Sequence, residues 1–323
     1  MQAEGYIHGI TTHSDAALRE ELDIKYGRVK RREKKDVLGR DADELIALQA
    51  KLGFKRVSDG QLLWPDLFRP AYLLMEGVTI GSQTRWFDTN GFAFTPLLDG
   101  KLSTRSADLS PVLFREKIPS SSVPKVTLPG PVTLAAHTEG AEDWQSLIPE
   151  YAQHIALLSR ELRKHGYRHI EYAEPSLLLP HAAPLAHEEG VVEACRAAYG
   201  HIVHGLDATT IIQLFFGNPN SIPPALLELP VSGFLLDLVE APIADGTKLS
   251  LKGKILVAGA IDSRSSVPED LGLAERRVQQ AVKALHPREV HITTNGPLFY
   301  TISSEPSREK LREIAALTAK VAA

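Results

Sequence analysis

The stretch His169-Ile170-Glu171-Tyr172-Ala173-Glu174-Pro175 (HIEYAEP) has the pattern of a short strand that ends in a carboxylate and a proline. It lies between two helical patterns, at residues 144–166 and at about 188–205. The first helical pattern carries an apolar residue every three or four positions from Leu147 to Leu162, as an amphipathic helix does. A strand between two helices is the repeating unit of a parallel sheet, so this stretch predicts a β-α-β arrangement.

The same alternation extends in both directions along the chain. Further strands are expected at residues 6–10, 56–61, 125–131, 209–217, 233–240, 254–262 and 289–295. Further helices are expected at residues 42–54, 221–229, 270–285 and 307–321. Several of the strands are nearly continuous apolar runs, which is typical of a parallel sheet buried on both faces.

Eight such units in 323 residues favour a (β/α)8 TIM barrel over a doubly wound sheet. A doubly wound sheet should also have a glycine-rich phosphate turn after its first strand, and GITTHS (9–14) lacks that pattern. Residues 62–124 are irregular, aromatic and rich in turns. We therefore expect one barrel domain, 1–323, with a hairpin-containing excursion at about 62–124 after the second strand.

Composition narrows the function. The net charge of −4 argues against nucleic acid as a partner, and no segment approaches 18 uninterrupted apolar residues. The N-terminus has no apolar signal region, and Cys195 is the single cysteine, in a helical pattern where it should pack in the core. We expect a cytoplasmic protein that acts on a small molecule, with no membrane or nucleic-acid partner.

One short segment, Tyr26 to Lys35 (YGRVKRREKK), is strongly basic. A solvated loop or helix face is the expected reading of such a segment. Contact with an anionic ligand or with a neighbouring subunit is the alternative, and the sequence leaves both open.

The chemistry of a TIM barrel sits at the carboxyl ends of its strands, and polar residues end several of the strands expected here. Each residue taken alone could simply cap a turn or a helix. Together they should converge on one mouth, because the strand ends of a barrel face the same side. The candidates at this mouth are Asp59, Gln61, Glu174, Gln213, Glu240, Asp262, Arg264 and Asn295, with His13 and His137 after the first and third strands.

Strand alternation separates two of the acidic residues. Side chains of a strand point to opposite faces in turn, so Asp237 and Glu240 cannot share a face unless the strand bulges or ends between them. Glu240 is nearer the strand end and is the stronger candidate for the site. Asp237 is expected to be a buried, hydrogen-bonded structural carboxylate.

Several strand-end motifs resemble one known family. They are SDGQLLWPDLF (58–68), LPGPVTL (128–134), IEYAEPSL (170–177), GAIDSRSSVPED (259–270) and NGPLFYTISSEPSREKLREIAALT (295–318). Their order and spacing resemble the C-terminal catalytic barrel of cobalamin-independent methionine synthase, in the superfamily that also contains uroporphyrinogen decarboxylase. The resemblance implies a single-barrel relative, a function in methionine biosynthesis, and methyl transfer from a methylated folate or methylcobalamin to a thiol.

The resemblance also implies a catalytic zinc, and this sequence departs from that pattern. The family's zinc ligands are a His and a Cys on strand 5, a Glu on strand 6 and a Cys on strand 8. Here Gln213 and Phe215 replace the first pair, Glu240 is retained, and Asn295 replaces the last cysteine. Amides are poor zinc ligands, so we predict a mouth without catalytic zinc. Gln61 likewise replaces a family glutamate.

Three functions follow as alternatives. The first is a zinc-free methyl (C1) transferase acting on a thiol or another small polar acceptor, in which Glu174, Glu240 and Asp262 handle protons, while Trp64 or Phe215 stacks on a pterin-like ring. The second is a metal-free lyase or decarboxylase that holds an anionic substrate with an arginine. The third is a non-catalytic protein that binds a methylated cofactor. A homo-oligomer or a corrinoid protein partner fits the resemblance, and the sequence decides neither.

Overall fold

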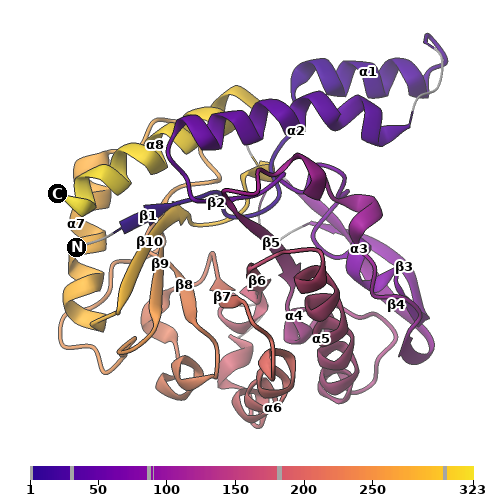
Figure 1. The fold of residues 1–323 in the computed structure, drawn as a ribbon. Helices are drawn as coiled ribbons and strands as arrows, with labels where there is room; N and C mark the ends of the chain where they lie inside the picture. The colour runs from indigo at the N-terminus through magenta and orange to yellow at the C-terminus, as the bar shows by residue number, and fades with distance from the viewer. Residues whose placement is uncertain (1–2, 30–32, 86–88, 90, 180–183, 301–303) are drawn as a thin grey trace.

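The computed structural model describes residues 3–29, 33–85, 89, 91–179, 184–300 and 304–323. Eight parallel strands form one sheet in the order β1-β10-β9-β8-β7-β6-β5-β2. These strands are β1 (Ala3–Gly5), β2 (Arg56–Val57), β5 (Val123–Pro129), β6 (His169–Ala173), β7 (Thr209–Leu214), β8 (Gly233–Asp237), β9 (Ile255–Ile261) and β10 (Glu289–Thr294). The edge strands β1 and β2 approach each other, and just beyond them the amide of Thr11 donates a 3.1 Å hydrogen bond to the carbonyl of Gly60. The sheet is therefore nearly closed, which confirms the predicted (β/α)8 barrel (Figure 1).

Helices cover the outside of this sheet (Figure 1). The α-helices are α1 (Asp15–Lys25), α2 (Lys34–Lys51), α3 (Arg69–Tyr72), α4 (Pro131–Ala136), α5 (Ile148–Lys164), α6 (Val191–Val203), α7 (Leu271–Leu285) and α8 (Ser304–Ala322). Short 3-10 turns lie at Ser110–Val112, Arg115–Lys117, Trp144–Leu147, Pro175–Leu177, Leu185–His187, Pro219–Ser221, Pro224–Glu228 and Leu298–Tyr300. The apolar positions predicted for α5 are buried against the sheet, as its periodicity required.

The excursion after β2 contains the expected hairpin. Strands β3 (Met75–Arg85) and β4 (Phe92–Thr104) pair antiparallel and form a two-stranded sheet apart from the barrel. The hairpin is tied to the loop after α4, because the carboxylate of Glu139 accepts hydrogen bonds from the amide of Ser82 and the hydroxyl of Thr95.

Several expected boundaries were wrong, each for a local reason. The first strand is Ala3–Gly5 rather than 6–10, and β2 covers two residues rather than six, because the chain leaves the hydrogen-bonded ladder early at both edges of the sheet. The helix expected at 221–229 is a 3-10 turn, since Pro223 and Pro224 lack the amide hydrogens that an α-helix needs. Helix α1 was not predicted, although Ser14 caps it with its side chain.

No helix in the described ranges is long and apolar enough to span a bilayer. Cys195 is a free thiol that lies buried on α6, as expected for a core residue.

Candidate functional site

The polar residues at the carboxyl ends of the strands form two sets. In the first set the side chains are buried and hydrogen-bonded to the protein itself: Asp59, Gln61, Glu174, Gln213, Asp237 and Asn295. In the second set, Glu240, Asp262 and Arg264 remain accessible to solvent. The two sets have different chemical capacities, because a side chain must be reachable to contact a ligand.

Asp237 and Asn295 hold four strand ends together. Oδ2 of Asp237 accepts from the amide of Phe216 at 2.9 Å and from Nδ2 of Asn295 at 3.0 Å. Its Oδ1 accepts from the amides of Val239 and Glu240 at 2.9 and 2.8 Å. Burial raises the pKa of Asp237 to about 7, which these donors lower only in part. The expectation that Asp237 is a buried structural carboxylate agrees with these contacts.

The other side of Asn295 is also engaged. Its Oδ1 accepts a 2.9 Å hydrogen bond from the amide of Ser263, just after β9. The backbone of Asn295 packs so closely on β9 that a Cβ at Gly259 would lie 2.8 Å from the Asn295 Cα. Both functional atoms of this amide therefore bind the protein, and its predicted role in substrate binding stays a prediction.

Glu174 follows β6, and its carboxylate lies against the N-terminal end of α4. Its carboxylate accepts hydrogen bonds from the amides of Val132 and Thr133 at 3.0 and 2.7 Å and from the hydroxyl of Tyr199 at 2.9 Å. Gly130 makes this possible, since a Cβ there would lie 2.1 Å from the Glu174 carboxyl carbon. Burial raises the pKa of Glu174 to about 7. The contacts give this carboxylate a structural task, and its predicted catalytic role stays a prediction.

Gln61 and Asp59 fix the loop after β2. The Gln61 side chain bonds the backbone of Thr127 twice, with its Nε2 donating to the carbonyl and its Oε1 accepting from the amide, both at 2.9 Å. Asp59 accepts from the amides of Gln61 and Phe114 at 2.9 and 2.7 Å, and burial raises its pKa. The positive φ of 47° at Gln61 is held by these contacts.

Gln213 points into the barrel interior rather than into an open cavity. Its Nε2 donates to the carboxylate of Glu171 and, at 3.2 Å, to the carbonyl of His8. Glu171 in turn forms a fully buried ion pair with Lys125, 2.9 Å away, and a 2.7 Å contact with Nε2 of His169.

This buried network was not foreseen as a unit from the sequence. Its signal is the alternation of polar residues at every second position of β5 and β6, which places them on the inner face of the barrel. Lys125 and nearby His169 lower the pKa of Glu171 against the opposing effect of burial.

Glu240, Asp262 and Arg264 form the accessible cluster. The Arg264 guanidinium lies 3.7 Å from the Glu240 carboxylate and 3.4 Å from that of Asp262. It stacks over the ring of Phe216, 4.8 Å from the ring centre. The Phe216 ring fits there because Gly296 has no Cβ, which would lie 2.5 Å from the ring. These three predicted residues are thus brought together, with one cation between two carboxylates.

The remaining candidates are packed against neighbours. His13 contacts the carbonyl of Leu62 at 2.7 Å, and Nδ1 of His137 contacts the carbonyl of Thr133 at 2.9 Å. Trp64 is buried, and its indole N–H has no hydrogen-bond partner among the described residues. Phe215 is buried edge-on against the His8 ring, 5.2 Å away. Stacking of Trp64 or Phe215 on a cofactor ring stays a prediction.

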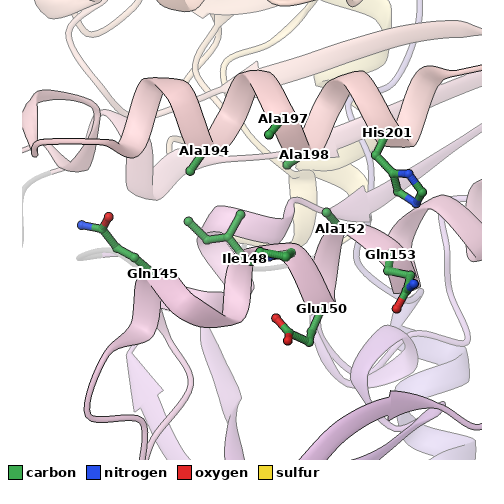
Figure 2. A pocket seen from close by; sticks show the side chains of 10 residues that line it. Gln145, Ile148, Glu150, Ala152, Gln153, Ala194, Ala197, Ala198 and His201 are labelled. Atoms are coloured by element: carbon green, nitrogen blue, oxygen red, sulfur yellow. The ribbon is translucent and has the colours of Figure 1, made fainter.

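The hollows found near this mouth among the described residues are small. Two cavities near it, one beside Thr11 and Ser307 and one beside Leu67 and Pro297, each have a volume of about 20 Å³, room for about one water molecule. A larger hollow of about 370 Å³ lies in the outer helical layer between α5 and α6, as Figure 2 shows. This hollow is lined by small side chains such as Ala152 on α5 and Ala194 and Ala198 on α6.

The residues at the family's zinc positions do not fit a zinc ion. Gln213 binds Glu171, Asn295 binds Asp237 and Ser263, Phe215 is apolar, and Glu240 pairs with Arg264. In the described part of the chain, no three His, Cys, Asp or Glu side chains are grouped so that they could hold a metal ion.

Comparison with known proteins places the chain in a family. The family model described as "Cobalamin-independent synthase, N-terminal domain" matches residues 76–286. The chain is 32% identical over 237 residues to the 5-methyltetrahydropteroyltriglutamate–homocysteine methyltransferase of Rhodopseudomonas palustris (strain TIE-1), covering 70% of this chain and 29% of the relative. It is 28% identical over 246 residues to the enzyme of that name from Candida albicans (strain SC5314), covering 72% of this chain and 31% of the relative. The chain thus spans about a third of the length of these curated relatives.

Solved structures share the fold over their whole length. A B12-independent methionine synthase from Shewanella sp. W3-18-1, in complex with selenomethionine, matches with a TM-score of 0.73 and 16% identity, over 99% of this chain and 98% of that one. A putative vitamin-B12 independent methionine synthase from Listeria monocytogenes matches with a TM-score of 0.74 and 14% identity, over 99% of both chains.

These findings confirm the family resemblance and agree with a single-barrel relative. The matching model is that of the N-terminal domain, whereas the motifs quoted from the sequence resemble the C-terminal barrel. Because the match covers most of the barrel, the chain belongs to the cobalamin-independent methionine synthase family.

Proposed function

We propose that this protein is a methyltransferase of the methionine synthase type that works without a catalytic zinc at its barrel mouth. Its relatives carry the name of a methyltransferase that acts on homocysteine, which supports methyl transfer as the reaction class. The absence of zinc is supported by Asn295, which stands at one of the family's zinc positions. Both the nitrogen and the oxygen of its side-chain amide are hydrogen-bonded to the protein, to Asp237 and to Ser263.

The accessible cluster supplies the groups that such a reaction needs. A thiol reacts as its thiolate, and a nearby cation lowers a thiol's pKa by stabilising the thiolate. Arg264 is such a cation, and Glu240 or Asp262 beside it can accept the proton. The thiolate sulfur then forms a bond to the donor's methyl carbon. The bond between that carbon and its donor atom breaks, and its electron pair stays with the donor.

The donor in this proposal is a methylated folate or methylcobalamin, and the acceptor is a thiol or another small polar molecule. The test is to incubate the purified chain with each donor and a panel of small thiols, and to measure methylated product by mass spectrometry. We expect product with at least one pair, and a fall of about 10²–10⁴-fold in kcat/KM for Glu240→Gln or Arg264→Met. Absence of product with every donor and acceptor would contradict the proposal.

A matched control is available at the opposite end of the barrel. Arg288 and Glu289 lie at the start of β10 and form a comparable exposed ion pair at 3.4 Å. Glu289→Gln and Arg288→Met should leave the methyl-transfer rate unchanged. An equal loss in the control variants would mean that the mouth cluster has no special role.

One observation favours a second candidate, a non-catalytic protein that binds a methylated cofactor. Most of the polar groups at the mouth are already hydrogen-bonded to the chain, which leaves few of them to take part in a reaction. Such a protein should gain thermal stability from methylfolate or methylcobalamin without releasing methylated product. Turnover of a carboxylated substrate without any methyl donor would instead favour the lyase alternative.

A further inference from the structure

Helix α1 carries an apolar stripe on the face that points away from the protein. Its inner face packs through Ala17 in a small core with α2 and the loops after β2. On the outer face Leu18 and Leu22 are 42 and 48% exposed, and just after the helix Tyr26 and Val29 are 63 and 46% exposed. Figure 1 shows α1 at the edge of the molecule, beyond α2.

The concentration of these side chains is unusual for this surface. Ten large hydrophobic side chains are exposed in the described part of the chain, and four of them fall between residues 18 and 29. Leu18, Leu22 and Tyr26 follow one another at intervals of four residues, so they lie along one side of the helix. An apolar stripe of this kind, opposite a face that is already packed, is characteristic of a contact with another molecule.

The charges around the stripe indicate which molecule it is. Asp15, exposed at the start of α1, lies in line with the stripe, three residues before Leu18. Lys25 and Arg28 are exposed at the other end, where Arg28 also forms an ion pair with Asp23 of its own chain at 3.1 Å. If two copies of α1 lie antiparallel, the acidic start of each helix faces the basic end of the other. The apolar side chains of the two copies then pack against each other in the middle of the contact. The surface is therefore complementary to a second copy of itself.

We propose that α1 is a docking surface for the α1 helix of a second copy of this chain, arranged antiparallel about a two-fold axis near Leu22. This inference does not depend on the proposed function. Helix α1 has 11 residues, so its length is about 16 Å from a rise of 1.5 Å per residue. A contact of this length buries less than the ~800 Å² per partner that is typical of a stable interface. We therefore expect a Kd for the dimer of roughly 1 to 100 micromolar.

Analytical ultracentrifugation of the full chain over this concentration range tests the proposal. We expect the wild-type chain to show a monomer–dimer equilibrium. The double variant Leu18→Glu/Leu22→Glu should weaken the dimer by at least about tenfold in Kd, because it places charge in the apolar centre. Leu157→Glu and Leu273→Glu replace exposed leucines on α5 and α7 and should leave the equilibrium unchanged. A monomeric wild-type chain, or equal weakening in the controls, would overturn the proposal.

Two further variants test the arrangement of the helices. The single native cysteine, Cys195, is buried, so Leu22→Cys introduces an accessible thiol into a clean background. This variant should form a disulfide-linked dimer under mild oxidation, while Leu157→Cys should not. Asp15→Lys should weaken the dimer, and combining it with Lys25→Glu/Arg28→Glu should restore it.

No cross-link for Leu22→Cys, or no restoration by the charge exchange, would contradict the antiparallel pairing. Binding of the wild-type chain to vesicles of anionic lipid, lost in Leu18→Glu/Leu22→Glu and without self-association, would assign the stripe to a membrane surface instead.

Discussion

The side-chain amide of Asn295 donates a 3.0 Å hydrogen bond to the carboxylate of Asp237, and so joins the end of β10 to the end of β8. The same amide accepts from the backbone of Ser263 after β9. Asn295 stands where the family's zinc-binding cysteine is expected. An amide fits this position because it can donate to the carboxylate and accept from the backbone at once, which a thiolate cannot do.

Replacing Asn295 with the family's cysteine should therefore destabilise the fold at this mouth. Asn295→Cys removes one of the two donors to Oδ2 of Asp237 and the acceptor of the Ser263 amide, and we expect it to lower the free energy of unfolding by about 1–3 kcal/mol. Urea unfolding measures this loss. Asp245→Asn, at an exposed position of the loop after β8, is the control and should change stability by less than about 0.5 kcal/mol. A stable Asn295→Cys variant that gains a zinc ion would show that the mouth retains the family's site.

Glu174 should be needed for folding as well as for any chemistry. Its two oxygens accept the first amides of α4, so Glu174→Gln turns an NH2 group toward one of them. We expect a loss of about 1–3 kcal/mol in the free energy of unfolding, because one buried donor then faces another. Glu240→Gln, at an accessible carboxylate, should leave stability almost unchanged. Equal stability of wild type and Glu174→Gln would argue against the capping role.

The buried pair Lys125–Glu171 makes a separate prediction. Lys125→Met leaves the Glu171 carboxylate buried without its cation and should destabilise the protein by about 3–5 kcal/mol. The double variant Lys125→Met/Glu171→Leu should recover part of that loss, with a coupling energy of at least about 1 kcal/mol.

The exposed pair formed by Lys117 and Asp43 at 2.8 Å is the comparison, and Lys117→Met should cost less than about 1 kcal/mol. Additive losses at Lys125 and Glu171 would show that the two residues do not depend on each other.

Buried histidines should make the barrel sensitive to acid. Burial lowers the pKa of His154 and of His169 to about 4, of His8 to about 3 and of His291 to about 2. Between pH 6.5 and about 4 the unfolded chain, with histidine pKa values near 6.5, therefore binds protons that the folded chain excludes. Their contribution to stability is complete above about pH 6.5 and is lost as the pH falls.

Buried carboxyl groups oppose this trend, since Glu174 and Asp237 with pKa values of about 7 hold protons in the folded state that the unfolded chain has released, and the raised pKa of Asp59 acts in the same direction. Near pH 5.5, the four histidines and the carboxyl groups of Glu174 and Asp237 together leave the unfolded chain with about two more bound protons than the folded chain. The free energy of unfolding therefore rises with pH by at most ~2.7 kcal/mol per pH unit. Urea unfolding from pH 5 to 7 measures it. His154→Gln should lower this slope by the contribution of about one proton. His204→Gln, at an exposed position, should leave the slope unchanged. A slope unaffected by His154→Gln would contradict the assignment.

Much of the barrel could be predicted from sequence because the relevant signals are local. The apolar runs at β7, β8 and β9 and the periodicity of α5 identify their elements directly. Strand alternation also separated the structural Asp237 from the accessible Glu240. The edge strands β1 and β2 were misplaced because their ladders break off after two or three residues, which depends on tertiary pairing rather than on residue type.

The site was harder to predict than the fold. The sequence shows that Gln61, Gln213 and Asn295 follow strands, and that polar groups gather at one end of the barrel. It does not show whether each amide faces a ligand or a neighbouring backbone, because that depends on side-chain packing across several strands. The Arg264 stack on Phe216 likewise requires the turn at Gly296, which lies 32 residues away in the chain.

We expect the mouth of this barrel to hold no catalytic zinc, and the zinc content of the purified chain measures this. The purified chain is equilibrated with excess zinc, passed through gel filtration, and analysed by elemental mass spectrometry beside Glu240→Ala. We expect well below one zinc per chain in wild type and the same low content in the variant. One zinc retained per wild-type chain, and lost in Glu240→Ala, would contradict it.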